Sequence, residues 1–251
     1  MTERGKTDRG DGVMLAWAHT PGRGPTAVFL PGYMSDMEGA KALETEAFCI
    51  EHRLACLRLD YSGHGSSGGA FTDGTIGRWT EDALLLIDRL TTGPLVLVGS
   101  SMGGWIALLA ALARPGRIHG LLGIAAAPDF TEDLMWTAMM PAERARLLRD
   151  GVVPVPSDYG DPYPVTAALI TDGRSRLLLG APIPLTCRVR LLQGQADLDV
   201  PWETALRLAA RLDAADVRVT LLKDGDHRLS RPTDLLLLRL TLRELLLQDG
   251  P

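Results

Sequence analysis

Cysteine and lysine are scarce in this chain of 251 residues. Its three cysteines, Cys49, Cys56 and Cys187, form no CxxC pair and no metal-ligand spacing, which favours buried thiols over disulfides or a zinc site. Lysine supplies only three of the 26 basic residues, a compositional bias from which we infer nothing functional. The formal net charge of −5 disfavours nucleic acid or an anionic membrane surface as the main partner.

Long hydrophobic runs and targeting segments are also missing. The most apolar stretch, residues 235–247, contains Arg239, Arg243 and Glu244, which favours a docked terminal helix over stable membrane insertion. Residues 1–11 lack an apolar core and include acidic side chains, so they fit neither a secretory signal nor a transit peptide. We therefore expect a disordered lead-in and a cytoplasmic protein.

Strand-like and helix-like segments alternate along most of the chain. Short apolar runs, typical of strands buried on both faces, lie at residues 13–18, 27–30, 54–59, 95–98, 121–125, 188–192 and 217–222. Segments with helical periodicity lie at residues 40–52, 76–90, 105–113, 202–212 and 233–247. This alternation predicts an α/β fold with a mostly parallel sheet flanked by helices, in a single domain over residues 1–251.

The alternation fails between residues 129 and 183. Two helix-like pieces, 129–139 and 141–149, precede a stretch rich in proline and glycine and a further helical piece at 165–179. An insertion that follows a strand at the ligand-binding end of a sheet can cover a site. We expect residues 129–183 to form a small helical lid.

A GxSxG motif, Gly99-Ser100-Ser101-Met102-Gly103, stands between an apolar strand-like run and an apolar helix pattern. This context predicts a strained turn from strand to helix that lifts one serine hydroxyl above the sheet. Glycines beside the serine leave room for that turn. Ser101 is therefore the candidate nucleophile.

A serine nucleophile needs a base within hydrogen-bond reach. Only His119 and His227 follow Ser101 in the chain, as this arrangement requires. His119 comes just before the strand expected at 121–125, whereas His227 lies in a polar loop directly after the strand expected at 217–222. His227 is the candidate general base.

The base needs a carboxylate that orients it, and two follow the strand expected at 188–192. We favour Asp197. Asp199 remains an alternative, although Pro201 resembles a helix start that Asp199 could cap.

Acyl transfer also needs donors for the oxyanion of the tetrahedral intermediate. We expect the N–H groups of Met102, directly after the nucleophile, and of Tyr33, beside Gly32 in the loop after an early strand. Adaptable side chains of the expected lid could line an acyl channel, namely Met135, Trp136, Met139 and Met140.

Two further motif matches are weaker. Residues 65–69 also fit GxSxG, but no apolar helix follows them, so we interpret them as a turn. Residues 63–68 fit GxGxxG, with Asp88 twenty residues farther on. No helix opens there and Asp88 falls within a helix pattern, which disfavours dinucleotide binding.

Taken together, these residues resemble the α/β-hydrolase family, and within it the subgroup of the mitochondrial palmitoyl-protein thioesterase that also acts as a mycophenolic acid acyl-glucuronide esterase. The similar stretches are Phe29-Leu-Pro-Gly-Tyr33, Lys41-Ala-Leu43, Asp60-Tyr-Ser-Gly63, Gly99-Ser-Ser101, Gly103-Gly-Trp105, Ala113-Arg-Pro115, Pro182-Ile-Pro184, Val200-Pro-Trp202 and Asp226-His-Arg228. The resemblance implies a serine thioesterase or esterase with Ser101, Asp197 and His227 as nucleophile, acid and base. It also implies no metal and no organic cofactor.

The sequence therefore predicts a serine hydrolase that cleaves carboxylic esters or thioesters through an acyl-enzyme. Its substrates would be small-molecule or protein-linked acyl groups, with no nucleic-acid partner. Two alternatives stay open: a ligand-binding protein of the same fold that turns over slowly or not at all, and another reaction of the same residues, such as C–C bond hydrolysis or cofactor-free haloperoxidation.

Overall fold

The computed structural model describes residues 1–155 and 162–247, and an eight-stranded sheet forms its centre in the order β1-β2-β4-β3-β5-β6-β9-β10. The six strands from β4 to β10 in this order pair in parallel, whereas β1 with β2 and β2 with β4 are antiparallel. The strands are β1 Glu3–Asp8, β2 Met14–Thr20, β3 Arg23–Leu30, β4 Leu54–Leu59, β5 Leu95–Ser100, β6 Ile118–Ile124, β9 Arg188–Gly194 and β10 Val217–Leu222. The mostly parallel sheet predicted from the sequence is confirmed.

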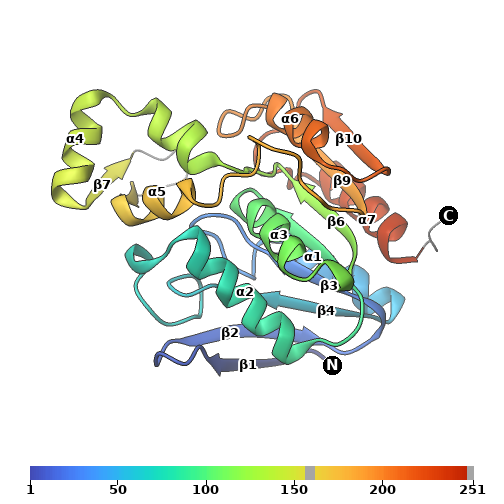
Figure 1. The fold of residues 1–251 in the computed structure, drawn as a ribbon. Coiled ribbons are helices and arrows are strands. Elements are labelled where there is room, and N and C mark those ends of the chain that lie inside the picture. Colours follow the sequence, from blue (N-terminus) through green and yellow to red (C-terminus); the bar gives the residue numbers. More distant parts are fainter. Residues whose placement is uncertain (156–161, 248–251) are drawn as a thin grey trace.

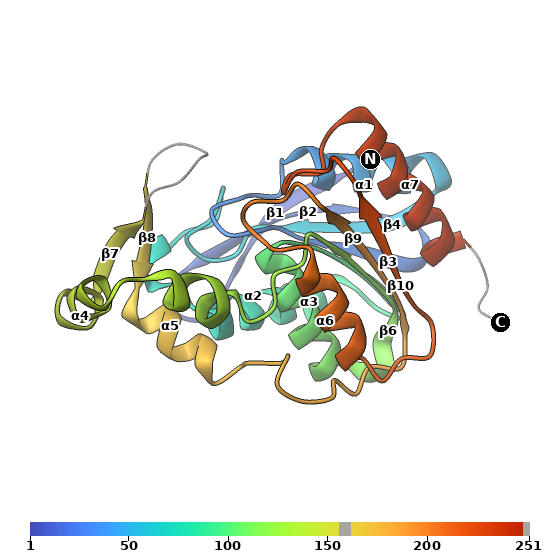
Figure 2. The same ribbon diagram turned by 90° about the horizontal axis from the view of Figure 1, so that it is seen from above.

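Helices cover both faces of the sheet (Figures 1 and 2). α1 and α7 lie on one face, and α2, α3 and α6 lie on the other. The helices are α1 Ala40–His52, α2 Ile76–Leu90, α3 Met102–Ala113, α6 Glu203–Arg211 and α7 Pro232–Leu247, with short 3-10 turns at Phe71–Asp73 and Pro115–Arg117. Because both faces are covered, every residue of β4 and β5 is buried, which explains their unalternating apolar runs.

The N-terminal residues are ordered in a strand, so the prediction of a disordered lead-in is wrong for residues 3–8. β1 contains no apolar side chain, but it lies at the edge of the sheet and pairs antiparallel with β2 along its whole length. An edge strand with mostly exposed side chains needs hydrogen bonds rather than an apolar pattern. Gly5 also packs directly against the ring of Trp17, because a Cβ added to Gly5 would come within 2.4 Å of a ring atom.

The segment between β6 and β9 projects beyond one end of the sheet (Figures 1 and 2). It contains the π-helix η3 Thr131–Trp136, α4 Pro141–Asp150, β7 Val152–Val155, β8 Tyr163–Thr166 and α5 Ala167–Arg174. The helix expected from residue 165 begins only at Ala167, because residues 163–166 pair antiparallel with 152–155. Pro154 and Pro164 face each other in this two-stranded ribbon, where proline is tolerated at an edge. Residues 156–161 of the expected lid lie outside the described residues.

The two ends of this segment are joined by one buried carboxylate. Asp129, at its start, accepts the backbone N–H groups of Leu178 and Leu179, at its end, both at 2.8 Å. Burial raises the pKa of Asp129, and the two backbone hydrogen bonds oppose that shift. The projecting elements have a small core of their own, made by Met139, Leu147, Val153, Val165 and Ile170.

No helix in the described part of the chain has the length and apolar character needed to cross a membrane.

A buried histidine lies among aromatic rings close to the projecting segment. His64 is 3% exposed, and its ring centre lies 5.5 Å from that of Tyr61 and 5.0 Å from those of Phe71 and Trp79. Burial lowers the pKa of His64 from 6.5 to about 4, because these rings cannot solvate an imidazolium ion. The nearby carbonyl of Ser62, 3.2 Å from Nδ1, only partly offsets the shift.

This burial predicts an acid-sensitive fold. Between pH 6.5 and about 4, His64 binds a proton in the unfolded chain but stays neutral in the folded protein. The free energy of unfolding therefore falls as the pH drops through that window. A difference of this size corresponds to about 3 kcal/mol. In His64→Phe, which keeps a ring in the cluster, the loss of stability between pH 6.5 and pH 4, measured by urea unfolding, should be smaller by that amount. Equal losses in the two proteins would contradict the explanation.

Candidate active site

Ser101 occupies a strained turn between β5 and α3. Its backbone has φ 54° and ψ −121°, a conformation that costs a non-glycine residue about 1–3 kcal/mol. The Ser101 N–H donates to the carbonyl of Ile124 at 2.9 Å. A Cβ on Gly99 would come within 2.3 Å of the Gly103 carbonyl oxygen, and one on Gly103 within 2.0 Å of that of Leu30. The turn therefore requires both glycines of the motif.

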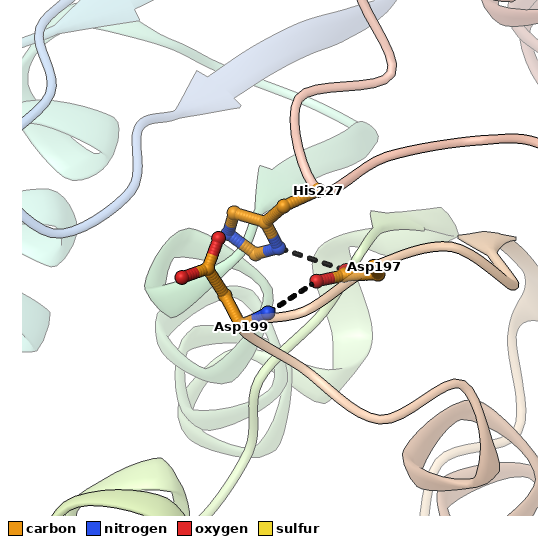
Figure 3. A group of neighbouring side chains, drawn as sticks. All are labelled: Asp197, Asp199 and His227. Atoms are coloured by element: carbon orange, nitrogen blue, oxygen red, sulfur yellow. Dashed lines mark hydrogen bonds and ion pairs between the residues drawn. The ribbon is translucent and has the colours of Figure 1, made fainter. Parts of the chain in front are cut away.

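Ser101, His227 and Asp197 form one hydrogen-bonded row. His227 lies in the loop after β10, and its Nε2 is 3.0 Å from Ser101 Oγ. Its Nδ1 is 2.8 Å from Oδ2 of Asp197, in the loop after β9 (Figure 3). Because a carboxylate only accepts, Nδ1 carries the proton and Nε2 accepts the serine O–H. The structure thus brings together the three residues selected from the sequence.

Asp197, rather than Asp199, is the acid in this row. Its side chain is fully buried, and Oδ1 accepts the backbone N–H groups of Asp199 at 2.9 Å and Val200 at 2.8 Å. Oδ2 accepts the side-chain amide of Gln193 at 2.9 Å in addition to His227. Asp199 is exposed and does not cap α6, whose N-cap is Trp202 without a side-chain hydrogen bond. The cap proposed for Asp199 is therefore not formed.

The same three side chains, Asp197, Asp199 and His227, also form a group with potential metal-ligand atoms within 4.8 Å of one another (Figure 3). Both nitrogens of His227 and both oxygens of Asp197 already take part in hydrogen bonds. A metal ion would have to break this row to use them. The hydrogen bonds of the row therefore occupy the atoms that a metal ion would use.

The two residues expected to hold an oxyanion border the nucleophile. Met102 begins α3, where backbone N–H groups precede the helical hydrogen-bond ladder. Tyr33 follows Gly32, and a Cβ on Gly32 would lie 3.3 Å from Cβ of Ser101, so any larger residue there would require the loop or the serine turn to shift slightly. The Tyr33 phenol donates to the carbonyl of Pro164 in β8 at 2.9 Å, which ties this loop to the projecting segment.

The second GxSxG match is a structural loop. The Ser67 hydroxyl donates to the Asp60 carbonyl at 2.7 Å and accepts the Ala16 N–H at 2.8 Å. The Asp60 carboxylate accepts the N–H of Ser66, and Gly63 N–H donates to Gly68, so the loop closes on itself. These bonds occupy the groups that a phosphate-binding loop would present to its ligand.

A cavity of about 750 Å³ opens over Ser101 and His227. Its lining on the projecting segment is mostly apolar and includes Phe130, Leu134, Met135, Met139, Val153, Val155 and Tyr163, together with the charged Glu143 and Arg146 of α4. The opposite wall carries polar groups, among them Ser35, Asp36, Lys41, Asp199 and Arg228. A volume of this order accommodates a ligand of the size of a drug or a fatty acyl group.

Two of the four side chains expected to line this cavity do so, and two do not. Met135 and Met139 line the cavity, whereas Trp136 and Met140 are not among its lining residues. Met135 and Trp136 are neighbours at the end of η3 and point in different directions, and Met140 is the N-cap residue of α4. Trp136 packs on the small core of the segment, with the guanidinium of Arg174 4.3 Å from its ring centre, and Met140 is 65% exposed.

Two polar residues near the row were missed by the sequence analysis. Lys41, one of three lysines, donates from Nζ to the carbonyl of Arg228, directly after His227. Burial lowers the pKa of Lys41 to about 8, which the negative charge of Asp226 partly offsets. Gln193 lies fully buried beside Asp197. A glutamine directly after Leu191 and Leu192 at the end of β9 was the available signal for the second residue.

The chain is similar to curated proteins named palmitoyl-protein thioesterase ABHD10, mitochondrial. The protein of this name from Homo sapiens is 41% identical over 242 residues, which is 95% of this chain and 78% of that protein. The one from Mus musculus is 40% identical over 92% of this chain and 78% of that protein. The prediction of a cytoplasmic location is wrong by this comparison, since these relatives carry a mitochondrial designation. The composition of residues 1–11 was no guide to location, because most of these residues belong to an edge strand.

Solved structures agree with the sequence relatives. A protein from Agrobacterium vitis S4, described as a hydrolase, superposes with a TM-score of 0.93 at 42% identity and covers 98% of both chains. Alpha/beta hydrolase domain-containing protein 10 from mouse superposes with a TM-score of 0.89 at 38% identity, covering 97% of this chain and 98% of that one. The sequence profile described as the alpha/beta hydrolase family matches residues 27–237. With this sheet, this serine turn and these relatives, the chain belongs to the alpha/beta hydrolase family.

Proposed function

We propose that this protein is a serine hydrolase that cleaves carboxylic esters or thioesters through an acyl-enzyme. The observation that carries the proposal is the row from Ser101 through His227 to Asp197, at the base of a cavity large enough for an acyl group. Membership of the alpha/beta hydrolase family and similarity to proteins named thioesterases support the same reaction class.

Each residue of the row has one role in this reaction. His227 Nε2 takes the proton of Ser101 as Oγ attacks the acyl carbonyl, and Asp197 stabilises the imidazolium that forms. The N–H groups of Tyr33 and Met102 donate to the oxyanion of the tetrahedral intermediate. His227 then protonates the departing thiolate or alkoxide, and it activates the water that releases the acid. None of these steps needs a metal or an organic cofactor.

The acyl chain would lie against the apolar wall of the cavity, made by residues of the segment 129–183. We propose that this segment is a lid within a single domain and that the space it leaves in the cavity sets the accepted acyl length. The relatives named palmitoyl-protein thioesterase support long acyl thioesters, linked to a protein or to a small molecule, as substrates. The leaving group would face the polar wall near Lys41 and Arg228.

Replacing the nucleophile tests the reaction class. Ser101→Ala should lower kcat for p-nitrophenyl butyrate by about 10⁴-fold to 10⁶-fold and leave the fold intact by circular dichroism. Ser67→Ala is the matched control, because it removes the serine of the second GxSxG match and should retain turnover. A fluorophosphonate probe should label wild type at Ser101 stoichiometrically. Full activity of Ser101→Ala would refute the hydrolase proposal, and absence of labelling would favour a ligand-binding protein.

The choice of acid can be tested by a pair of isosteric changes. Asp197→Asn should lower kcat by about 10⁴-fold, since the amide cannot hold the imidazole in the tautomer that accepts the serine proton. Asp199→Asn should cost far less activity than Asp197→Asn, because its carboxylate lies exposed on the cavity wall, outside the row. Steady-state hydrolysis of the same ester measures both. The reverse order of losses would assign the acid to Asp199.

The lid proposal predicts a change of chain-length preference. Met135→Trp should narrow the cavity beside its apolar lining. As a result, kcat/KM should fall at least about tenfold for palmitoyl thioesters and change little for butyryl ones. Met140→Trp adds the same ring to the same segment outside the cavity and serves as the control. A series of acyl-CoA thioesters from short to long measures the profile. Equal effects on all chain lengths would contradict the proposal that this segment sets the accepted acyl length.

A further inference from the structure

A glutamine side chain lies in the apolar layer directly behind the acid of the row. Gln193 is the penultimate residue of β9 and is fully buried. Its Nε2 is 2.9 Å from Oδ2 of Asp197 and 3.2 Å from the carbonyl oxygen of Val200. Its Oε1 is buried without a hydrogen-bond partner among the residues that the structure describes.

The surroundings fix which end of this amide faces Asp197. Both close neighbours, the carboxylate and the Val200 carbonyl, offer only acceptor oxygens, so an amide turned the other way would place oxygen against oxygen. Nε2 therefore donates to Asp197, and the unpaired Oε1 is the consequence of that orientation.

Fold stability does not explain this residue. A buried amide oxygen without a partner costs about 1–3 kcal/mol, whereas an apolar side chain of similar size would join the layers of Leu191 and Leu192 without that cost. An unsatisfied buried polar group in a native protein calls for an explanation, and a catalytic role is one such explanation. Its orientation instead gives a charge-assisted hydrogen bond from Gln193 to the carboxylate of Asp197, which also holds His227.

Two side chains donate to the same oxygen, Oδ2, of Asp197. His227 Nδ1 is the group that the carboxylate orients, and the amide of Gln193 holds the same oxygen from the side of the sheet. The other oxygen, Oδ1, accepts two backbone N–H groups. With all four donors in place the carboxylate is fixed in rotation, and part of its negative charge is taken up by the amide.

We propose that Gln193 is a positioning residue of the hydrolytic reaction, which sets the orientation and the electron density of Oδ2 of Asp197 and, through it, the basicity of His227. This inference rests on the proposed function and deepens it. Without the amide, Asp197 would rotate more freely, which lowers kcat. Its undiminished charge would also hold a protonated His227 more strongly, so the acidic limb of the kcat/KM profile would move to higher pH.

The test compares two variants of Gln193 with a neighbour. Gln193→Met keeps the length of the side chain and removes the donor, and Gln193→Glu places a second carboxyl group against Asp197. Leu192→Met is the matched control, because it makes a similar change on the adjacent residue of β9, whose side chain belongs to an apolar cluster with Leu238 and Leu242 of α7. Circular dichroism and urea unfolding establish that each variant is folded.

For Gln193→Met we expect kcat for p-nitrophenyl butyrate to fall about tenfold, KM to change less than twofold, and the acidic midpoint of kcat/KM to rise. The far-downfield proton resonance of His227 Nδ1–H should move farther downfield, a readout that needs no turnover. Gln193→Glu should lose more activity than Gln193→Met, and Leu192→Met should match wild type in all four quantities.

The inference is overturned if Gln193→Met and Gln193→Glu keep the kcat, the acidic midpoint and the resonance of wild type. It is also overturned if activity falls only in step with stability or KM, since the amide would then merely tether the loop through Val200. Either failure leaves Ser101→Ala inactive, so it is distinguishable from failure of the proposed function, in which Ser101→Ala would retain activity.

Discussion

The hydrogen bond between Ser101 and His227 joins residues 126 positions apart, and it exists because parallel strands end at one edge of a single sheet. The loops after β3, β5, β9 and β10 bring the Tyr33 backbone, Ser101, Asp197 and His227 to that edge. Ser101 itself is held in a backbone conformation that its own side chain disfavours. The surrounding sheet and glycines maintain that strain, so the geometry of the site depends on the packing of the whole sheet.

The site combines a buried carboxylate with a cavity that reaches Ser101 and His227. Four donors satisfy the buried carboxylate of Asp197. The cavity has a mostly apolar lining on the projecting segment and several polar groups elsewhere, which suits a substrate with an acyl chain on one side of its carbonyl and a polar leaving group on the other. Asp129 anchors both ends of the segment that forms the apolar wall.

Strong local patterns were sufficient to predict the framework and to select the candidate residues. The apolar runs of β4 and β5 and the glycines around Ser101 have local physical causes, so they could be recognised without coordinates. β1 could not be recognised, because an edge strand of polar residues carries no periodic signal. The directions of Trp136, at the end of the π-helix, and of Met140, at the N-cap of α4, were equally hidden, since they depend on how these two elements pack on the rest of the segment.

By itself, the sequence determined the central strands and the helices that alternate with them, the strained serine turn and the short set of polar residues that could serve it, because these follow from periodicity and local sterics. Only the tertiary structure decided between Asp197 and Asp199, which stand two residues apart in one loop and differ in burial and hydrogen bonding. It also placed the amide of Gln193 against the chosen carboxylate. Such choices depend on contacts between distant segments, which no local pattern encodes.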